Sequence, residues 1–249
     1  NETGALLTKY IFERRAANGT LPPNPVLIKT IVTSALAGKI AQKYGAEVFD
    51  LLTGFKFIGG KIGELEERGE AGRFVFGFEE SYGYLAGSYV RDKDAVIAAM
   101  LAVQAAAYYK AQGKTFCGVL DEIYGEFGIF LHSQLNVTCE GMSGLQHIKD
   151  IMSNLRDNPP EGFAGQKTVK MSDYLYSVTI DTRTGTQTDI TLPKSDVLAY
   201  LLSGGGEVIV RPSGTEPKIK VYLTAVGKTR EEALDVLKAL EKETGERVN

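Results

Sequence analysis

Residues 208–222 read Val-Ile-Val-Arg-Pro-Ser-Gly-Thr-Glu-Pro-Lys-Ile-Lys-Val-Tyr. An apolar run of β-forming residues enters a turn, and a second run leaves it with apolar and polar side chains alternating. Pro212 and Pro217 stiffen the turn, while Gly214 lets the backbone approach a ligand closely. The stretch therefore predicts two strands joined by a short loop.

The same loop carries groups that bind anions. Arg211 offers a planar fork of donors, and Ser213 and Thr215 offer hydroxyls. Successive backbone N–H groups in such a turn can form a nest for an anion. Three cations and one anion lie between residues 211 and 220, in a chain of net charge −3. The residues alone are compatible with a phosphate-binding loop and with an ordinary hairpin turn.

The elements around this hairpin predict a small α+β domain in the second half of the chain. Strands are expected at 130–138, around 169, at 178–180 and at 190–192, and helices at 142–155, 197–202 and 229–244. The last helix opens with Thr229-Arg230-Glu231-Glu232, which is typical of a capping box.

The first half alternates strand and helix patterns, which predicts an α/β layer with parallel strand pairing. Strands are expected at 26–32, 47–51 and 73–78, and helices at 2–17, 35–44, 61–68, 92–112 and 115–127. Residues 21–25 form a proline-rich linker and a first candidate boundary. The helix at 92–112 has apolar residues at helical spacing and is expected to pack in the core: Val96, Met100, Val103 and Ala107.

Composition limits the classes of function. The chain has 249 residues, of which 43% are hydrophobic and 24% charged, as in soluble globular proteins. The net charge of −3 gives no reason to expect a nucleic-acid partner, and no apolar run is long enough to span a membrane. Cys117 and Cys139 make no disulfide framework and are expected to be small buried residues. These features favour the cytoplasm.

A second loop, residues 77–83, reads Gly-Phe-Glu-Glu-Ser-Tyr-Gly and follows a predicted strand. Two adjacent carboxylates and a hydroxyl suit the recognition of a polyol, because a carboxylate accepts hydrogen bonds from neighbouring sugar hydroxyls. Residues 91–94, Arg-Asp-Lys-Asp, place cations at a helix start, where they oppose the helix dipole. The alternative is a solvated loop in which Asp92 caps the helix. Residues 53–56, Thr-Gly-Phe-Lys, follow a strand in the same way.

Four motifs together resemble the α-D-phosphohexomutase family, and most closely its bacterial phosphoglucomutase/phosphomannomutase branch. They occur in the family's order at residues 53–56, 77–83, 90–94 and 211–218, and residues 1–7 resemble the end of the family's second domain. The resemblance implies three segments: a C-terminal remnant of domain 2 at 1–23, a mixed α/β domain 3 at 24–129, and a TATA-binding-protein-like α+β domain 4 at 130–249. Because the chain also starts without a methionine, we expect it to be a piece of a longer protein.

The resemblance also implies roles for individual residues. In the first half it implies substrate binding, with Glu79 and Ser81 on the 3- and 4-hydroxyls of the sugar, Lys93 also on the substrate, and Thr53 and Gly54 lining the cleft. In the second half it implies binding of the phosphate on the non-reacting end of the sugar by Arg211, Ser213, Gly214 and Thr215. The match of Arg91 can be structural, so no ligand role is assigned to it.

Members of this family interconvert hexose 1-phosphate and hexose 6-phosphate through a phosphoserine and a bisphosphorylated sugar, with Mg²⁺ stabilising the transferring group. The family's serine loop is absent, because no His follows Thr33-Ser34-Ala35. Its triple-aspartate metal loop is also absent, and Asp92-Lys93-Asp94 makes a poor Mg²⁺ site. We therefore expect no catalytic or metal-binding residue in this chain and no mutase activity from it alone. Mg²⁺ and glucose 1,6-bisphosphate would belong to the full-length enzyme.

The expected partners are a hexose phosphate and the missing N-terminal domains. Two alternatives stay open: a phosphomannomutase or phosphopentomutase of the same fold, and a non-catalytic sugar-phosphate-binding module. A phosphoglucosamine mutase is less favoured, since Tyr82-Gly83 stands where that branch usually has a His.

Overall fold

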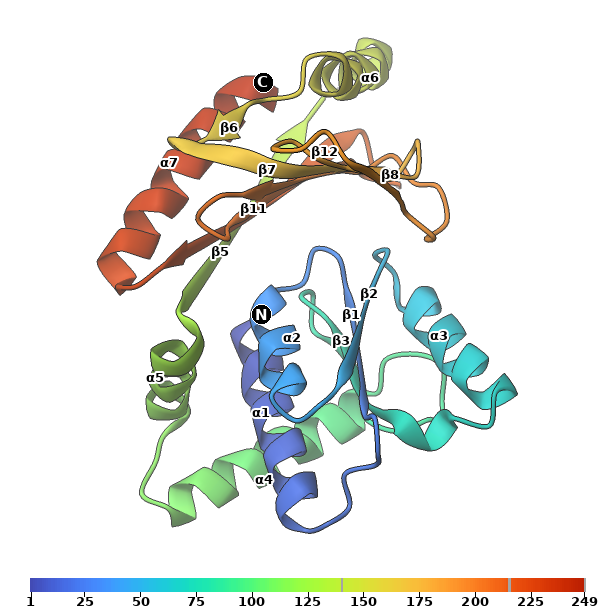
Figure 1. The fold of residues 1–249 in the computed structure, drawn as a ribbon, viewed down its shortest axis with the longest axis vertical. Coiled ribbons are helices and arrows are strands. Elements are labelled where there is room, and N and C mark those ends of the chain that lie inside the picture. The colour runs from blue at the N-terminus through green and yellow to red at the C-terminus, as the bar shows by residue number, and fades with distance from the viewer. Residues whose placement is uncertain (140, 215, 249) are drawn as a thin grey trace. The chain divides into compact units, whose positions relative to one another are not determined.

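The chain divides into two compact units, Asn1–Phe127 and Gly128–Asn249. They are seen in a computed structural model that describes residues 1–139, 141–214 and 216–248 (Figure 1). Each unit has its own sheet and its own helices, as the sequence predicts: a mixed α/β unit is followed by a β-rich unit with two helices.

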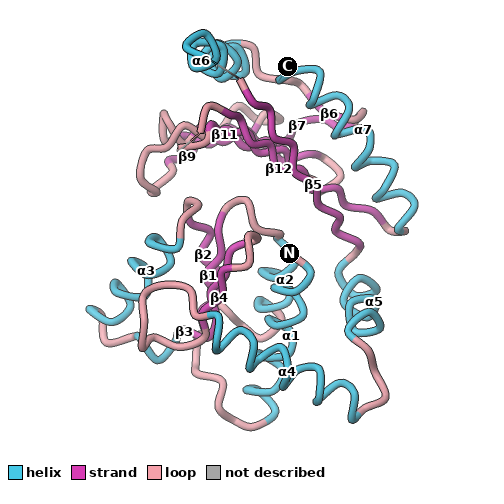
Figure 2. Tube along the Cα trace, turned by 180° about the vertical axis from the view of Figure 1, so that it is seen from behind, coloured by secondary structure: helices cyan, strands magenta, loops and turns pink. Residues whose placement is uncertain are grey.

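The first unit is built on a mixed sheet of order β2-β1-β3-β4. Its strands are β1 (Val26–Thr30), β2 (Glu47–Leu51), β3 (Phe74–Glu79) and β4 (Gly83–Leu85). Its helices are α1 (Glu2–Ala17), α2 (Ala35–Gln42), α3 (Phe55–Glu67), α4 (Ala95–Ala111) and α5 (Phe116–Phe127), with a 3₁₀ turn at Ala71–Arg73. Figure 2 shows α1 and α2 on one face of the sheet and α3 on the other. Strands β1 and β3 are buried along their whole length, because helices cover both faces.

The pairing of these strands decides where a ligand-binding site can form. Strand β1 pairs in parallel with both β2 and β3, and β3 turns back into β4 through an antiparallel hairpin. The carboxyl ends of β1, β2 and β3 therefore meet at one edge of the sheet. Ligands of open α/β sheets bind at this edge.

The boundary expected near residue 24 is wrong. Helix α1 packs against α2, β3, α4 and α5, and its Leu7 and Phe12 are buried in the core of the first unit. Residues 1–23 are therefore part of this unit. The proline-rich linker only carries the chain from α1 to the start of β1.

Helix α4 also differs from the prediction. It begins at Ala95, and its buried residues are Ala105 and Tyr109. The residues expected in the core are exposed instead: Val96 by 81%, Met100 by 47% and Val103 by 70%, with Ala107 also exposed. The helical period was right, but the face turned inward is the one that carries Ala105 and Tyr109.

The second unit is an antiparallel sheet of order β5-β12-β11-β10-β7-β8-β9, with β6 paired to β7. The strands are β5 (Ile129–Thr138), β6 (Gly162–Phe163), β7 (Gln166–Asp173), β8 (Val178–Asp181), β9 (Gln187–Asp189), β10 (Leu198–Leu202), β11 (Glu207–Pro212) and β12 (Lys218–Gly227). Helices α6 (Gly141–Asp157) and α7 (Arg230–Val248) lie on one face (Figure 1). Side chains from both helices and from the strands form one core, with Met152, Leu240 and Tyr200 among its buried members.

Two local predictions for this unit are wrong. Residues 198–202 form strand β10, not a helix, since Leu198, Tyr200 and Leu202 alternate into the core while the strand pairs with β7 and β11. A short apolar run cannot separate a buried strand from a helix by periodicity. Strand β9 ends before residues 190–192, where a strand was expected.

The two cysteines differ in their exposure to solvent. Cys139 is buried as expected, whereas Cys117 on α5 is exposed, and both are free thiols. Within the described residues, no helix is both long enough and apolar enough to cross a bilayer.

Candidate functional site

The first candidate site lies at the carboxyl edge of the sheet in the first unit. Strand β2 leads into Thr53 and Gly54, and β3 ends at Glu79 and opens the loop to Gly83. These are the motifs that the sequence singled out, although they lie more than twenty residues apart in the chain. The parallel topology brings them together.

Glu79 is the centre of this cluster. It is the last residue of β3 and is only 7% exposed. The backbone N–H of Gly54 donates to its Oε1 at 2.8 Å. A carboxylate offers about four lone-pair positions, so this bond leaves acceptor capacity for a ligand.

Lys93 reaches the same place from the loop before α4. A Cβ atom built on Gly83 would lie 2.8 Å from Lys93 Cδ and 3.1 Å from Glu79 Oε2, so the lysine stem and the carboxylate flank this glycine. Lys93 Nζ lies 5.0 Å from the centre of the Phe55 ring and 3.0 Å from Asp92 Oδ1. The stem of Lys93 thus lies beside the 77–83 motif, and its ammonium group lies near Phe55 of the 53–56 motif.

The remaining residues of the loop lie at the surface. Ser81 is exposed two positions after Glu79, and Thr53 is half-buried directly before Gly54. Tyr82 is 83% exposed and has a φ of 66°, a left-handed backbone conformation that is uncommon for a bulky residue. This turn lets the chain reverse within the hairpin from β3 to β4.

The residues around Lys93 have structural roles. Arg91 donates to Glu66 on α3 and to the Ser88 carbonyl. Asp94, not Asp92, caps α4 and accepts from Val96 N–H at 2.9 Å. A hydrogen bond from Tyr89, followed by those from the helix amides, lowers the pKa of the Asp94 carboxyl.

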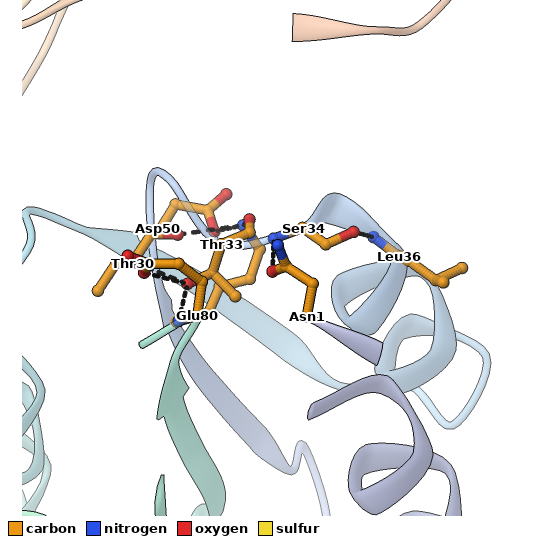
Figure 3. A network of polar contacts seen from close by, with 8 residues as sticks. Asn1, Thr30, Thr33, Ser34, Leu36, Asp50 and Glu80 are labelled. Atoms are coloured by element: carbon orange, nitrogen blue, oxygen red, sulfur yellow. Dashed lines mark hydrogen bonds and ion pairs between the residues drawn. The ribbon is translucent and has the colours of Figure 1, made fainter. Parts of the chain in front are cut away.

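A buried polar network behind the loop was missed by the sequence reading (Figure 3). Thr30 and Thr33, at the carboxyl end of β1 and just beyond it, have their hydroxyl oxygens 2.7 Å apart. Both contact Oε2 of Glu80, at 3.4 and 3.5 Å, and Thr33 Oγ1 accepts from Glu80 N–H at 3.1 Å. Burial raises the pKa of the Glu80 carboxyl, and the charge of Glu79 adds to this effect.

Lys29 completes this network. Its side chain is 5% exposed, and its Nζ lies 2.6 Å from Asp50 Oδ1 and donates to the Thr33 carbonyl at 2.8 Å. It therefore ties the end of β2 to the turn after β1. The available signal was a lysine inside the apolar strand run Val-Leu-Ile-Lys-Thr, because a fully buried lysine needs a partner.

The second candidate site is the loop between β11 and β12 in the second unit. Ser213 N–H donates to the Lys218 carbonyl at 2.7 Å, and Lys218 N–H donates to the Glu216 carbonyl at 2.8 Å. Arg211 stands directly opposite Lys220 in the ladder, so both cations project from one face of the sheet. The hairpin expected from residues 208–222 is present.

Within this loop, Gly214 has open space around it. A Cβ atom built there would meet no described atom within 4 Å, and its φ is not left-handed. Lys218 lies 2.6 Å from Glu216 and lowers the pKa of that carboxyl. Thr215, the fourth residue expected to bind phosphate, lies outside the described residues.

The residues do not fit the Mg²⁺ site that the resemblance implies for the full-length enzyme. Across the described residues, no group of three or more His, Cys, Asp or Glu side chains is arranged to hold a metal ion. Asp92 Oδ1 already accepts from the backbone and side chain of Lys93, and Asp94 Oδ1 caps α4.

Comparison with known proteins agrees with this architecture. Residues 1–127 match the family described as phosphoglucomutase/phosphomannomutase, alpha/beta/alpha domain III. Residues 148–242 match its phosphoglucomutase/phosphomannomutase C-terminal domain. The chain belongs to the phosphoglucomutase/phosphomannomutase family.

Its sequence relatives are longer proteins. It is 38% identical over 224 residues to the phosphoglucomutase of Staphylococcus haemolyticus (strain JCSC1435), an alignment covering 90% of this chain and 39% of that protein. The phosphoglucomutase of Staphylococcus aureus (strain MRSA252) gives the same identity and coverage. The chain thus spans 39% of the length of these relatives.

Solved structures show the same fold at low identity. The chain superposes on pp63/parafusin, a phosphoglucomutase from Paramecium in its open form, with a TM-score of 0.65 and 18% identity, over 99% of this chain and 40% of that one. A phosphoglucomutase/phosphomannomutase family protein from Burkholderia thailandensis gives a TM-score of 0.53 and 14% identity, over 97% and 42% of the two chains.

Proposed function

We propose that this chain is the sugar- and phosphate-binding part of a phosphoglucomutase-type isomerase. The first unit binds the hydroxyls of a hexose phosphate, and the second unit binds its non-reacting phosphate. In the full-length enzyme the phosphoryl group would move between a phosphoserine and the sugar, through a bisphosphorylated intermediate.

One observation carries the sugar-binding half of this proposal. Three separate motifs supply Gly54, Glu79 and Lys93, and the sheet gathers them around Gly83. A buried carboxylate and a lysine side chain on the same glycine offer both an acceptor and a donor to vicinal hydroxyls. Glu79 and Ser81 can bind the 3- and 4-hydroxyls in either orientation of the sugar, because those two groups exchange places when it turns end for end, and Lys93 contributes a further contact to the substrate.

The phosphate-binding half rests on the loop from Arg211 to Gly214. Arginine presents a rigid fork of donors that suits a phosphate, and Lys220 adds a second cation on the same face. The open space at Gly214 leaves room for the ligand near the backbone. Thr215 is proposed as a further ligand from the motif alone.

In this proposal the chain positions the substrate and does not itself transfer the phosphoryl group. Phosphoryl transfer depends on positioning and charge stabilisation, and these loops hold the ends of the substrate. The sequence offers no serine loop of the family type, so we expect the chain alone to turn over no glucose 1-phosphate. Sustained turnover by the purified chain, unaffected by further purification, would contradict this expectation.

Two substitutions test the binding roles by isothermal titration calorimetry. Arg211→Ala should weaken binding of both inorganic phosphate and glucose 1-phosphate by about 1.5–3 kcal/mol, the typical worth of a hydrogen bond to a charged group. Glu79→Ala should weaken glucose 1-phosphate by a similar amount and leave inorganic phosphate unchanged. Matched controls are Arg183→Ala, which removes an arginine that is bound to Asp181, and Glu67→Ala on the exposed end of α3.

The outcome also separates the alternatives. If Glu79→Ala weakens the binding of glucose 1-phosphate and of inorganic phosphate equally, the assignment of sugar binding to the first unit and of phosphate binding to the second is refuted. Titration with mannose 1-phosphate and ribose 5-phosphate would show whether the sugar loop favours a hexose, because the preferred configuration at C2 is not readable from the sequences of the two loops.

A further inference from the structure

We infer that Thr33 is a positioning residue for the sugar loop at residues 79–83. This inference rests on the proposed function, and it concerns a residue that lies outside all four motifs. Thr33 acts through the backbone and carboxylate of Glu80, and it need not touch the sugar (Figure 3).

Thr33 is itself held in place by burial and by hydrogen bonds to its backbone. It is 2% exposed and lies in the turn after β1. Its N–H donates to the Thr30 carbonyl at 2.9 Å, and its own carbonyl accepts from Lys29 Nζ at 2.8 Å. The next residue, Ser34, donates its N–H to Asn1 Oδ1 at 2.9 Å and caps α2. The backbone of Thr33 is therefore fixed on both sides.

The hydroxyls of Thr30 and Thr33 have enough protons to bind both each other and Glu80. Thr30 and Thr33 have two hydroxyl protons between them. One proton joins the two oxygens at 2.7 Å, and the other remains for Glu80 Oε2, which lies 3.4 and 3.5 Å from them. The Thr33 oxygen also accepts from Glu80 N–H at 3.1 Å. We call this pair of threonines with Glu80 the Thr30–Thr33 clamp.

The clamp is linked to the proposed sugar-binding residues through Glu80. Glu80 stands between Glu79 and Ser81, and its N–H belongs to the peptide plane that joins it to Glu79, so the hydrogen bond to Thr33 fixes the plane directly after Glu79. Glu79 is held independently by Gly54 N–H. The loop is thus anchored at two neighbouring residues by segments that follow β1 and β2, while Tyr82 completes the turn in a left-handed conformation.

The Thr30–Thr33 clamp carries a cost in the stability of the folded chain, because it buries polar groups. The hydroxyls are buried, and Glu80 is a partly buried carboxylate whose pKa is raised by desolvation. Burying such groups is unfavourable unless they are paired. A pair of valines would fill the same volume without buried hydroxyls, but it would leave the Glu80 N–H without this acceptor and Glu80 Oε2 without these donors. A positioning role for the loop explains why hydroxyls occupy this place.

The test compares Thr33→Val, which keeps the shape and removes the hydroxyl, with Thr33→Ser, which keeps the hydroxyl. Thr8→Val is the matched control, because Thr8 is equally buried in the same unit and its hydroxyl bonds to the Gly4 carbonyl of its own helix. Each variant is titrated with glucose 1-phosphate and with inorganic phosphate, and amide hydrogen exchange is followed at Glu80. Should Thr33→Val fail to fold, Thr33→Ala is measured in its place.

We expect Thr33→Val to lose about tenfold or more in affinity for glucose 1-phosphate, a change of about 1.4 kcal/mol, with unchanged affinity for phosphate. Exchange at the Glu80 amide should become faster, Thr33→Ser should behave like the unmodified chain, and Thr8→Val should change neither affinity. If the unmodified chain binds the sugar phosphate and Thr33→Val binds it equally well, the positioning role is refuted while the proposed function stands. If the unmodified chain binds phosphate but not glucose 1-phosphate, the proposed function and this inference fall together.

Discussion

Gly83 and Gly214 lie in the two candidate ligand-binding loops, and the chain surrounds them in opposite ways. A Cβ atom at Gly83 would come within 2.8 Å of Lys93 Cδ and 3.1 Å of Glu79 Oε2. A Cβ atom at Gly214 would meet no described atom within 4 Å. A methyl group at position 83 would therefore crowd the sugar loop, whereas one at position 214 would meet no described atom.

The difference shows two ways of preparing a binding loop. The sugar loop is held by its own unit, through Gly54 N–H on Glu79 and Thr33 Oγ1 on the Glu80 amide. Such preorganisation lowers the entropic cost of binding. The phosphate loop instead offers cations and open backbone, so the need for glycine there would come from the ligand.

The largest effect is expected from Gly83→Ala. The added methyl group must displace the Lys93 stem and crowd the Glu79 carboxylate. Because the lysine side chain is half-exposed and can shift, we expect the free energy of unfolding to fall by about 1 kcal/mol, the lower end of the usual cost of overpacking. Affinity for glucose 1-phosphate should fall by at least about tenfold, or about 1.4 kcal/mol. Urea denaturation and calorimetric titration measure the two quantities.

Gly60→Ala is the matched control for this substitution. Gly60 lies on α3 in the same unit, and a Cβ atom there would meet no described atom within 4 Å. Alanine is favoured over glycine in a helix interior by about 0.8–1 kcal/mol, so this variant should be more stable and bind normally. A Gly83→Ala variant that matches the original chain in both measurements would remove the claim that this loop is tightly packed.

The opposite pattern is expected from Gly214→Ala. Since the methyl group has room and the backbone is not left-handed, the free energy of unfolding should stay within about 0.5 kcal/mol of the original. Affinity for inorganic phosphate should fall about tenfold, because the methyl group occupies the space proposed for the ligand. Loss of stability with unchanged phosphate affinity would reverse the contrast between the two glycines.

Much of the first site could be predicted from sequence because its motifs follow strands. Once β1, β2 and β3 are parallel, their carboxyl ends must share an edge, so the motifs that carry Gly54 and Glu79 come to the same end of the sheet. The partners of Thr30, Thr33 and Lys29 could not be predicted in this way. These depend on which face of a turn points inward, and no local pattern encodes that.

The errors in the fold have a similar cause. Residues 198–202 and helix α4 both show apolar periodicity, but the pattern does not say what covers them. Tyr200 alternates into a core made by α6 and α7, which are distant in sequence. Val103 has the spacing of a core residue and is nevertheless 70% exposed, since Ala105 and Tyr109 take the inward positions. Tertiary packing decided both cases.

The smallest effect is expected from Glu80→Gln, which tests whether the sugar loop retains a group at a cost to stability. Burial raises the pKa of this carboxyl above its ordinary value of 4.5, so the folded chain binds the proton more tightly than the unfolded chain. The stability from this group is fully present below about pH 4.5 and is lost as the pH rises through the folded pKa. Glutamine does not titrate. The variant should therefore gain stability relative to the original chain between pH 4 and pH 7.

Urea denaturation at several pH values between 4 and 7 measures this difference. A difference that is constant with pH would mean that the Glu80 carboxylate bears no desolvation cost. A gain that appears towards pH 7 would show that the loop keeps an ionised carboxylate against its own stability. Such a cost is expected of a group that serves the loop's conformation, because stability alone would favour an uncharged side chain. No corresponding cost is expected in the phosphate loop, where Glu216 is exposed and its pKa is lowered by Lys218.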